Sequence, residues 1–166
     1  MGNKFPIFVK GISTCMNFIV KLPCTPLVEH FLKTQYGTPC RLKGRSGVAK
    51  LFYRLLERPS NKKSSMYSGY KNSIDVFITE NDFERFGCEL TRGDIMEFNN
   101  MVTDHIYELM SMSIVTQEEN IKERTIKESI FWWCDYFDFP QEVLSFDAAK
   151  KAYYRYRQRL ESDTED

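Results

Sequence analysis

The hydrophobic residues of this chain follow two spacings, one typical of β-strands and one typical of helices. Alternating apolar positions predict a strand over residues 74–79, and two further short strands are predicted over residues 17–22 and 39–42. Residues 59–73 are rich in Ser, Asn, Lys and Gly and keep neither spacing, so they predict a loop. We therefore expect a short sheet in the first half of the chain.

Helical spacing and capping residues predict three helices in this first half. The first has Thr25 as its N-cap, begins at Pro26 and ends at Gly37. The other two are predicted over residues 47–58 and 79–87. Together with the strands, these helices form a small basic αβ half.

Three more helices are predicted in the second half of the chain. The first opens with the capping sequence Thr91-x-x-Asp94 and runs to about residue 115. The second is predicted over residues 119–138, where oppositely charged side chains recur four positions apart, and the third over residues 145–160. The predicted fold class is α+β: a small basic αβ N-terminal half with a short sheet, followed by a three-helix C-terminal half.

The length of 166 residues predicts one domain, or two very small ones that share a core. We expect a basic αβ subdomain over residues 16–90, a helical subdomain over residues 91–160 and an acidic tail over residues 161–166. Residues 1–15 precede an internal methionine, Met16, and are expected to be an N-terminal extension.

The charges of the chain cancel in number but are segregated along its length. Lys and Arg number 23, as do Asp and Glu, yet the net charge is +11 over residues 1–73, −12 over 74–147, +5 over 148–160 and −4 over 161–166. Zero net charge therefore does not argue against an anionic partner such as nucleic acid. The question is whether the two signs neutralise each other within the fold or meet a partner.

Several classes of protein are disfavoured by the sequence. No apolar run approaches the roughly 18–20 residues of a membrane helix, so no membrane partner is expected. The five cysteines are an odd number without a close pair, which indicates reduced thiols, a cytoplasmic location and no zinc site. Neither of the two histidines, His30 and His105, lies in a catalytic motif. We expect a non-catalytic protein without metal or cofactor, with an active site assembled from distant residues as the alternative.

Residues 41–63 are the first candidate site, because eight cations face a single acid, Glu57, in this stretch. Clustered Lys and Arg bind phosphates with release of counterions, and aromatic rings on a nearby loop can stack on bases. The predicted nucleic-acid ligands of this region are Arg41, Lys43, Arg45, Lys62 and Lys63, with Tyr67 and Tyr70 as stacking residues. The alternatives are docking of these cations on the acidic half of the chain or on a protein partner, and binding of a small anionic ligand.

The last predicted helix is the second candidate site. Its cations Lys151, Arg155, Arg157 and Arg159 are predicted to contact DNA, as the recognition helix of a helix-turn-helix unit does. The alternative is a structural role, because cations near a helix C-terminus suit the helix dipole without any partner.

Aromatic residues crowd residues 131–139, where six of nine positions are aromatic and one helix face cannot bury them all. Phe131, Trp132 and Tyr136 are therefore predicted to lie at an interface with another element or another chain. A cofactor pocket is the less favoured alternative.

Acidic residues dominate the middle of the chain, and Glu97, Asp104 and Glu108 share one face of a predicted helix. A solvated helix face explains them most simply, with a partner-binding or DNA-mimicking surface as the alternative. A di-metal site would need an inward Glu-x-x-His pair, which is missing.

Three segments carry a resemblance to a known group of proteins: Phe-Ile-Val-Lys-Leu-Pro at 18–23, Gly37 at the end of the first helix, and Ala-Tyr-Tyr-Arg-Tyr-Arg at 152–157. In these segments the chain resembles small uncharacterised proteins of bacterial phages and integrated mobile elements. The resemblance implies a regulator or an accessory nucleic-acid binder. The leading hypothesis is thus a non-catalytic nucleic-acid-binding accessory or regulatory protein. The alternative is a protein–protein adaptor or oligomer that uses its basic and acidic faces.

Overall fold

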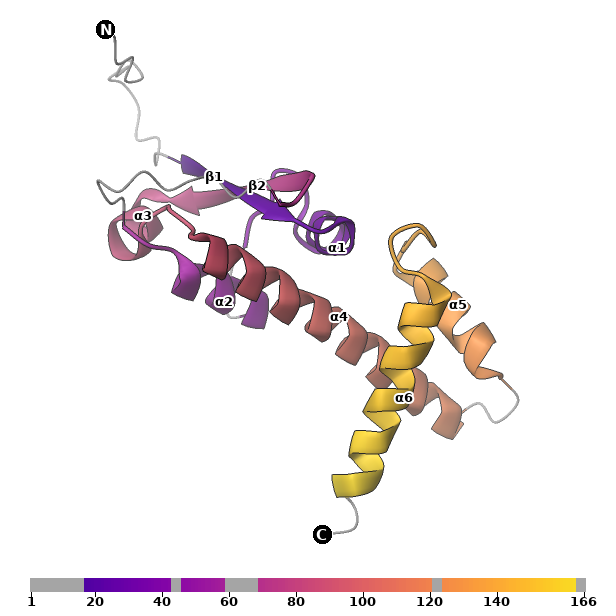
Figure 1. Ribbon diagram of the computed structural model, residues 1–166. Helices are drawn as coiled ribbons and strands as arrows, with labels where there is room; N and C mark the ends of the chain where they lie inside the picture. Colours follow the sequence, from indigo (N-terminus) through magenta and orange to yellow (C-terminus); the bar gives the residue numbers. More distant parts are fainter. Residues whose placement is uncertain (1–16, 43–45, 59–68, 121–123, 164–166) are drawn as a thin grey trace, which may run out of the picture.

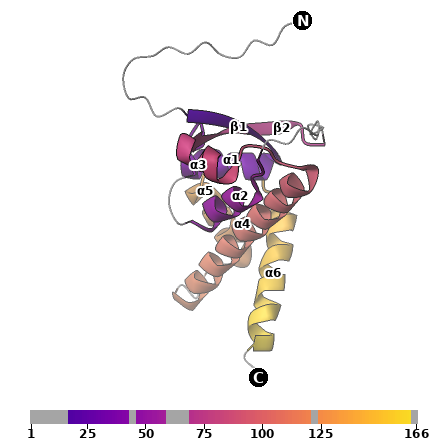
Figure 2. The same cartoon turned by 90° about the vertical axis from the view of Figure 1, so that its left-hand side faces the viewer.

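The computed structural model describes residues 17–42, 46–58, 69–120 and 124–163. Within these residues, two strands form a sheet at one side of the molecule, and the helices lie below it or beyond its end (Figures 1 and 2). The predicted α+β fold class is confirmed.

The sheet consists of β1 (Asn17–Cys24) and β2 (Asn72–Thr79), which pair antiparallel. Val20 lies opposite Val76, and both side chains are buried beneath the sheet. The predicted strands over residues 17–22 and 74–79 are confirmed. β2 begins at Asn72, inside the segment predicted to be a loop, and residues 59–68 of that segment lie outside the described residues.

The third predicted strand, over residues 39–42, is wrong. Only Cys40 joins the sheet, as a single bridge: its N–H donates to the carbonyl oxygen of Asp75 at 2.9 Å, and its carbonyl accepts from the N–H of Phe77 at 2.9 Å. Pro39 has no N–H to donate, so a hydrogen-bonded ladder does not extend through it.

Capping residues start the three helices of the N-terminal half, as predicted for Thr25 and Thr79 but not for Ser46. α1 (Pro26–Tyr36), α2 (Gly47–Leu55) and α3 (Glu80–Phe86) each follow an N-cap residue whose hydroxyl accepts a hydrogen bond from a backbone N–H in the first turn. These N-caps are Thr25, Ser46 and Thr79.

A carboxylate on α1 ties this helix to the start of β2. Glu29 accepts hydrogen bonds from Lys33, at 2.6 Å, and from the side-chain amide of Asn72. Burial by itself raises the pKa of Glu29, but the two hydrogen bonds and the nearby charge of Lys33 together hold the pKa below its ordinary value. The ionised carboxylate is therefore the form that the fold favours.

α4 (Arg92–Asn120) is the long helix to which both halves of the molecule attach (Figure 1). The sheet, α1 and α2 pack along its first turns, while α5 (Ile126–Tyr136) and α6 (Phe146–Asp163) pack along its last turns. Each half therefore completes its packing on the same helix.

The predicted boundary between the second-half helices is wrong. α4 continues to Asn120 instead of ending near residue 115, and α5 begins at Ile126 instead of near residue 119. The hydroxyl of Thr125 accepts from the N–H of Glu128, whose carboxylate accepts from the N–H of Thr125 at 2.8 Å. This capping box starts a new helix, and the charge pairs spaced four residues apart had concealed it. At the other end, α6 extends to Asp163, into the predicted acidic tail.

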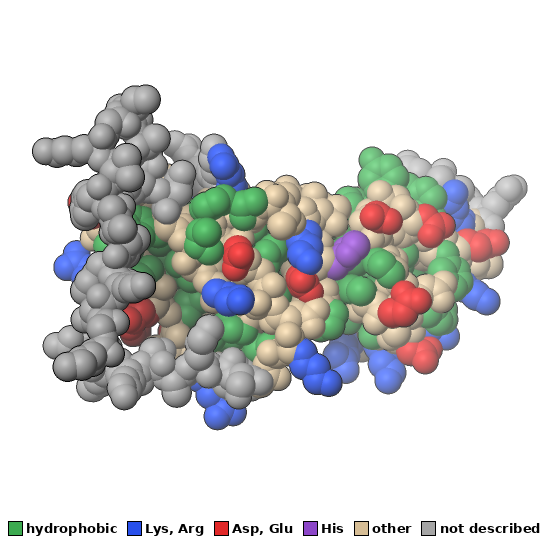
Figure 3. All heavy atoms as spheres, turned by 90° about the horizontal axis from the view of Figure 1, so that it is seen from above, with side chains coloured by type: hydrophobic (Ala, Val, Ile, Leu, Met, Phe, Trp, Pro, Cys, Tyr) green, Lys and Arg blue, Asp and Glu red, His purple; other side chains and the backbone are tan. Residues whose placement is uncertain are grey.

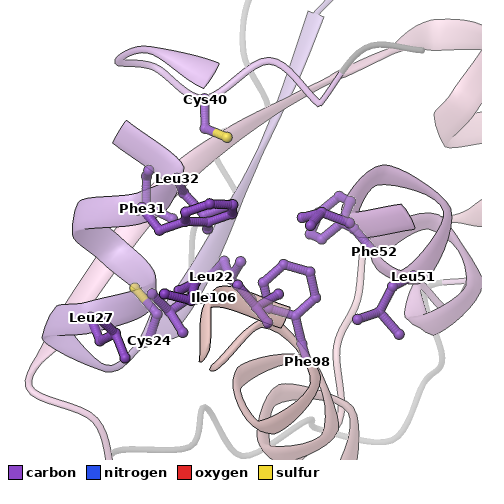
Figure 4. Close-up of a cluster of buried hydrophobic side chains, with 14 of the residues drawn as sticks. Leu22, Cys24, Leu27, Phe31, Leu32, Cys40, Leu51, Phe52, Phe98 and Ile106 are labelled. Carbon is purple, nitrogen blue, oxygen red and sulfur yellow. The ribbon is translucent and has the colours of Figure 1, made fainter. Parts of the chain in front are cut away.

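Buried side chains form one core that runs from the sheet to the C-terminal helices. Leu22 from β1, Phe31 from α1, Phe52 from α2 and Phe98 from α4 meet beneath the sheet (Figure 4). Farther along α4, the same core includes Trp133 of α5 and Tyr153 of α6. The two predicted subdomains are thus joined by continuous apolar packing.

Candidate interaction surface

The residues predicted to bind phosphates in the basic stretch are located only in part. Arg41 is exposed, and its guanidinium lies 5.2 Å from the centre of the Phe77 ring, while Tyr70 is half-buried. The other members of that set lie outside the described residues: Lys43, Arg45, Lys62, Lys63 and Tyr67. A phosphate-binding cluster in this stretch therefore stays a prediction.

One cation of the basic stretch docks on the acidic half of the chain. Arg54 of α2 lies 2.7 Å from the carboxylate of Glu97 on α4. Both side chains are largely exposed, so the pair contributes roughly 0–1 kcal/mol to stability. Viewed onto the sheet side, several acidic side chains gather at the end formed by the C-terminal helices (Figure 3). Among the described residues, the basic stretch therefore neutralises only part of the acidic half of the chain.

A groove between α4 and α6 brings acidic residues of the middle of the chain against the last basic helix. Its volume is about 650 Å³. One wall carries Asp104 and Glu108 of α4 and the other carries Arg155 and Arg159 of α6, all four exposed. The remaining lining residues are Tyr107, Ser111, Ala152, Gln158 and Ser162. We call this feature the α4–α6 groove, with an acidic wall and a basic wall.

Helical spacing explains why each wall is continuous. On α4, residues 104, 108 and 111 recur at intervals of four and three, and on α6 residues 152, 155, 159 and 162 follow the same rule. Ala149 and Tyr153 are buried where α6 enters the core. Their burial fixes the rotation of α6 and turns the neighbouring arginines toward the groove.

The polar groups that face the groove are not satisfied across it. Among the described residues, no ion pair within 4.0 Å joins the acidic wall to the basic wall. Ser111 is only 1% exposed, and its hydroxyl is buried beneath the groove without a hydrogen-bond partner among the described residues. Burial also raises the pKa of Tyr107, so its phenol stays protonated and able to donate. The groove thus offers opposite charges and the phenol of Tyr107 to whatever enters it.

A second hollow, of about 340 Å³, lies on the other side of the acidic wall, between α4 and α2. It is lined by Gly47, Val48, Leu51, Met101, Val102, Asp104, His105 and Glu108. Asp104 and Glu108 therefore form a ridge between this mostly apolar hollow and the α4–α6 groove. His105 is exposed on the ridge, with its ring 6.2 Å from that of Phe31. The lining supplies carboxylates and an imidazole but no hydroxyl or thiol nucleophile.

Metal ligation and membrane insertion find no support in the part of the chain that the structure describes. There, no group of three or more His, Cys, Asp or Glu side chains is placed to hold a metal ion, and no helix is long and apolar enough to cross a membrane. Four cysteines, Cys24, Cys40, Cys88 and Cys134, are free thiols that lie buried or half-buried. Burial raises the pKa of each of them, to about 12 for Cys24 and about 11 for Cys40. These thiols are packing residues.

The three residues predicted to form an aromatic interface differ in exposure. Tyr136 is 69% exposed and stacks at 5.2 Å on Trp132, which is half-buried. Phe131 is also half-buried and stacks at 5.6 Å on Phe146 of α6. Packing between α5 and α6 therefore accounts for Phe131, and Tyr136 is the residue left for contact with another molecule.

No protein-family model matches this sequence, and neither the curated proteins nor the solved structures include a significant match to it. The resemblance to phage and mobile-element proteins therefore stays a prediction.

Of the residues predicted to bind nucleic acid that the structure describes, Arg155 and Arg159 are the two that line this groove. The prediction missed Ser111, Tyr107 and Gln158 as site residues. The helical spacing of Ser111 with Asp104 and Glu108 was the signal that could have indicated a shared face.

Proposed function

We propose that this chain is a protein-interaction module, an adaptor whose α4–α6 groove binds a partner segment that carries both charge signs. The observation that supports the proposal is a groove with carboxylates on one wall and guanidinium groups on the other, unpaired across it. A peptide with a cation on one side and an anion on the other complements both walls.

Electrostatics favour this partner over a uniform polyanion. A phosphate backbone drawn to Arg155 and Arg159 would also approach Asp104 and Glu108 on the facing wall. Like-charge juxtaposition of this kind costs free energy and selects against the wrong partner. A mixed-sign protein segment avoids the repulsion and uses both walls.

Panning of a displayed library of random peptides on the immobilised chain tests the proposal. We expect the enriched peptides to carry both basic and acidic residues and to bind in fluorescence anisotropy. The double variants Asp104→Lys/Glu108→Lys and Arg155→Glu/Arg159→Glu should each weaken this binding by about tenfold or more, because each leaves one wall repulsive. If only one of the two double variants weakens binding, only the wall that it alters contacts the peptide, and the proposed use of both walls is wrong.

Matched controls separate the groove from the overall charge of the molecule. Lys50→Glu and Glu84→Lys reverse exposed charges on α2 and α3, away from the groove, and should change the affinity by less than about twofold. If the library yields no binder, or if neither double variant weakens the binders it yields, the adaptor proposal is wrong.

Nucleic-acid binding by α6 is the second candidate function. Lys151, Arg155 and Arg159 are exposed along one side of this helix, four residues apart, where they can reach successive phosphates. Anisotropy with duplex DNA, single-stranded DNA and RNA at low salt measures it, and the affinity should fall steeply as salt rises.

The acidic-wall variant distinguishes the two functions. Asp104→Lys/Glu108→Lys should strengthen binding to nucleic acid and weaken binding to a mixed-sign peptide. We propose a cytoplasmic location in either case, because the four described cysteines are reduced and buried. A regulatory or accessory role in a phage or mobile element, which the resemblance implies, fits either function.

A further inference from the structure

Among the described residues, β1 has a free edge on the side away from β2. Cys40 lies on the side of β2 that faces away from β1, where it forms backbone hydrogen bonds with Asp75 and Phe77. The backbone N–H and C=O groups of these two residues therefore point away from β1. In the antiparallel register, Ile19 lies opposite Phe77 and Lys21 opposite Asp75. These are non-hydrogen-bonded pairs of the antiparallel ladder, in which the N–H and C=O groups of both residues point away from the neighbouring strand. The N–H and C=O groups of Ile19 and Lys21 therefore point away from β2.

The free edge is short because α4 closes one end of it. Pro23 has no N–H, and its carbonyl already accepts a hydrogen bond from the side-chain amide of Asn99 at 3.1 Å. The edge-facing residues that are left are Asn17, Ile19 and Lys21. Within the described part of the chain, no backbone hydrogen bond outside the β1–β2 ladder reaches Ile19 or Lys21. These positions are symmetric about Ile19.

The solvent-exposed face of the sheet beside this edge has an apolar centre, and the charges next to that centre cancel. Ile19 is 59% exposed and lies next to Phe77, whose ring is covered by Arg41. Lys21 and Asp75 are exposed cross-strand neighbours of opposite charge on the same face. An exposed isoleucine on an unpaired strand edge is a feature that monomeric sheets usually avoid.

We propose that a second copy of this chain pairs with the β1 edge, antiparallel about a two-fold axis at Ile19. Ile19 then lies opposite Ile19 of the partner subunit, and Lys21 lies opposite Asn17 of the partner subunit. The two sheets become one four-stranded sheet, with the strands in the order β2, β1, β1, β2. Its outer face carries a cross-strand row in which the two isoleucines are flanked by Phe77 of each subunit.

Side-chain chemistry favours a second copy as the occupant, because the exposed Ile19 side chains of the two copies meet at the axis and no like charges face each other. The edge-facing positions are symmetric about Ile19, so the antiparallel register centred there satisfies the edge peptide groups of both copies. In this register each Lys21 faces an uncharged residue and keeps its own Asp75 beside it, so no lysine faces a lysine. The proposal rests on the sheet alone and is independent of the α4–α6 groove.

Sedimentation velocity over a wide concentration range, combined with amide hydrogen exchange, tests the proposal. We expect the mass of the full chain to rise from 19.6 kDa toward twice that value as the concentration rises, while the amides of Ile19 and Lys21 become protected in parallel. Ile19→Lys, which places like charges across the axis, should weaken association by about tenfold or more. Ser73→Lys adds the same charge to the outer face of β2 and should associate like the unmodified chain.

Ile19→Pro provides a second perturbation of the edge. It removes an N–H that points away from β2, so it abolishes association while leaving the β1–β2 ladder intact, as circular dichroism can verify. A chain that stays at monomer mass at every concentration would overturn the proposal, whether the Ile19 and Lys21 amides exchange freely or are protected by another segment of the same molecule. A dimer that Ile19→Lys leaves unchanged would overturn it as well.

Discussion

Asn99 is the buried polar residue that fastens α4 to the junction of β1 and α1, and its replacement makes the sharpest test of this fold. Its side chain is 1% exposed; its oxygen accepts from the N–H of Thr25 at 2.8 Å, and its amide nitrogen donates to the carbonyls of Pro23 at 3.1 Å and Ile95 at 2.7 Å. Two of these bonds bridge more than seventy residues of sequence. They hold the first strand and first helix on the central helix.

Asn99→Ala should destabilise the protein by about 3 kcal/mol. The substitution leaves the Thr25 N–H and the Pro23 carbonyl without their partner, and an unsatisfied buried group costs about 1–3 kcal/mol. For a chain of this size the loss corresponds to a fall in Tm of about 6–12 °C. Urea unfolding followed by circular dichroism measures the free energy, and Asn100→Ala, at the exposed neighbouring position, should stay within about 0.5 kcal/mol of the unmodified chain.

Asn99→Asp adds a pH dependence that a purely steric effect would lack. A carboxylate at this site is buried and faces the carbonyl oxygens of Pro23 and Ile95, so its pKa in the folded state should lie above the unfolded value of about 3.9. The protonated acid can still donate one hydrogen bond, so the stability difference from the unmodified chain should be small near pH 4 and grow as the pH rises toward 7. A loss below about 0.5 kcal/mol for Asn99→Ala, or a pH-independent difference for Asn99→Asp, would refute the assigned role.

Three further predictions concern backbone geometry, titration and thiol reactivity. Gly87→Ala should cost more than about 4 kcal/mol in urea unfolding, because φ is 93° and a Cβ would overlap a backbone carbonyl. Gly37→Ala, where φ is 77° but the space is open, should cost about 1–3 kcal/mol; equal losses would contradict the overlap. Glu29→Gln should destabilise the protein at pH 7. The difference should vanish as the pH falls below the ordinary value of 4.5 and through the lowered folded pKa, and a difference that persists in acid would contradict it. Cys24 and Cys40 should resist iodoacetamide at pH 8 in the folded protein and react once urea unfolds it, as mass spectrometry of the peptides would record; rapid labelling of the folded chain would contradict their burial.

Local chemistry made much of the fold predictable. Thr25, Pro26 and Gly37 specify the start and end of α1 because an N-cap hydroxyl, a proline at the first helical position and a glycine at the C-terminus act within one turn of the chain. The alternating apolar positions of β2 were equally informative, because a strand with one buried face must bury every second residue.

The errors arose where local signals competed. Charge pairs spaced four residues apart predicted a continuous helix across residues 119–125. In the structure, the capping box of Thr125 and Glu128 starts α5 at Ile126 instead. Cys40 sits in a segment with strand-like residues, but a strand needs a partner with matching donors, and Pro39 removes one.

The sequence by itself determined that this is an α+β chain, where most of its helices and strands lie, and that its charges occur in blocks of alternating sign. Only the tertiary structure decided that α4 and α6 place Asp104 and Glu108 opposite Arg155 and Arg159, and that no other described segment pairs with the β1 edge around Ile19. The physical reason is distance along the chain. Capping and periodicity act over a few residues, whereas a groove or a sheet edge depends on how buried residues such as Ala149, more than forty positions from the acidic wall, orient one helix against another.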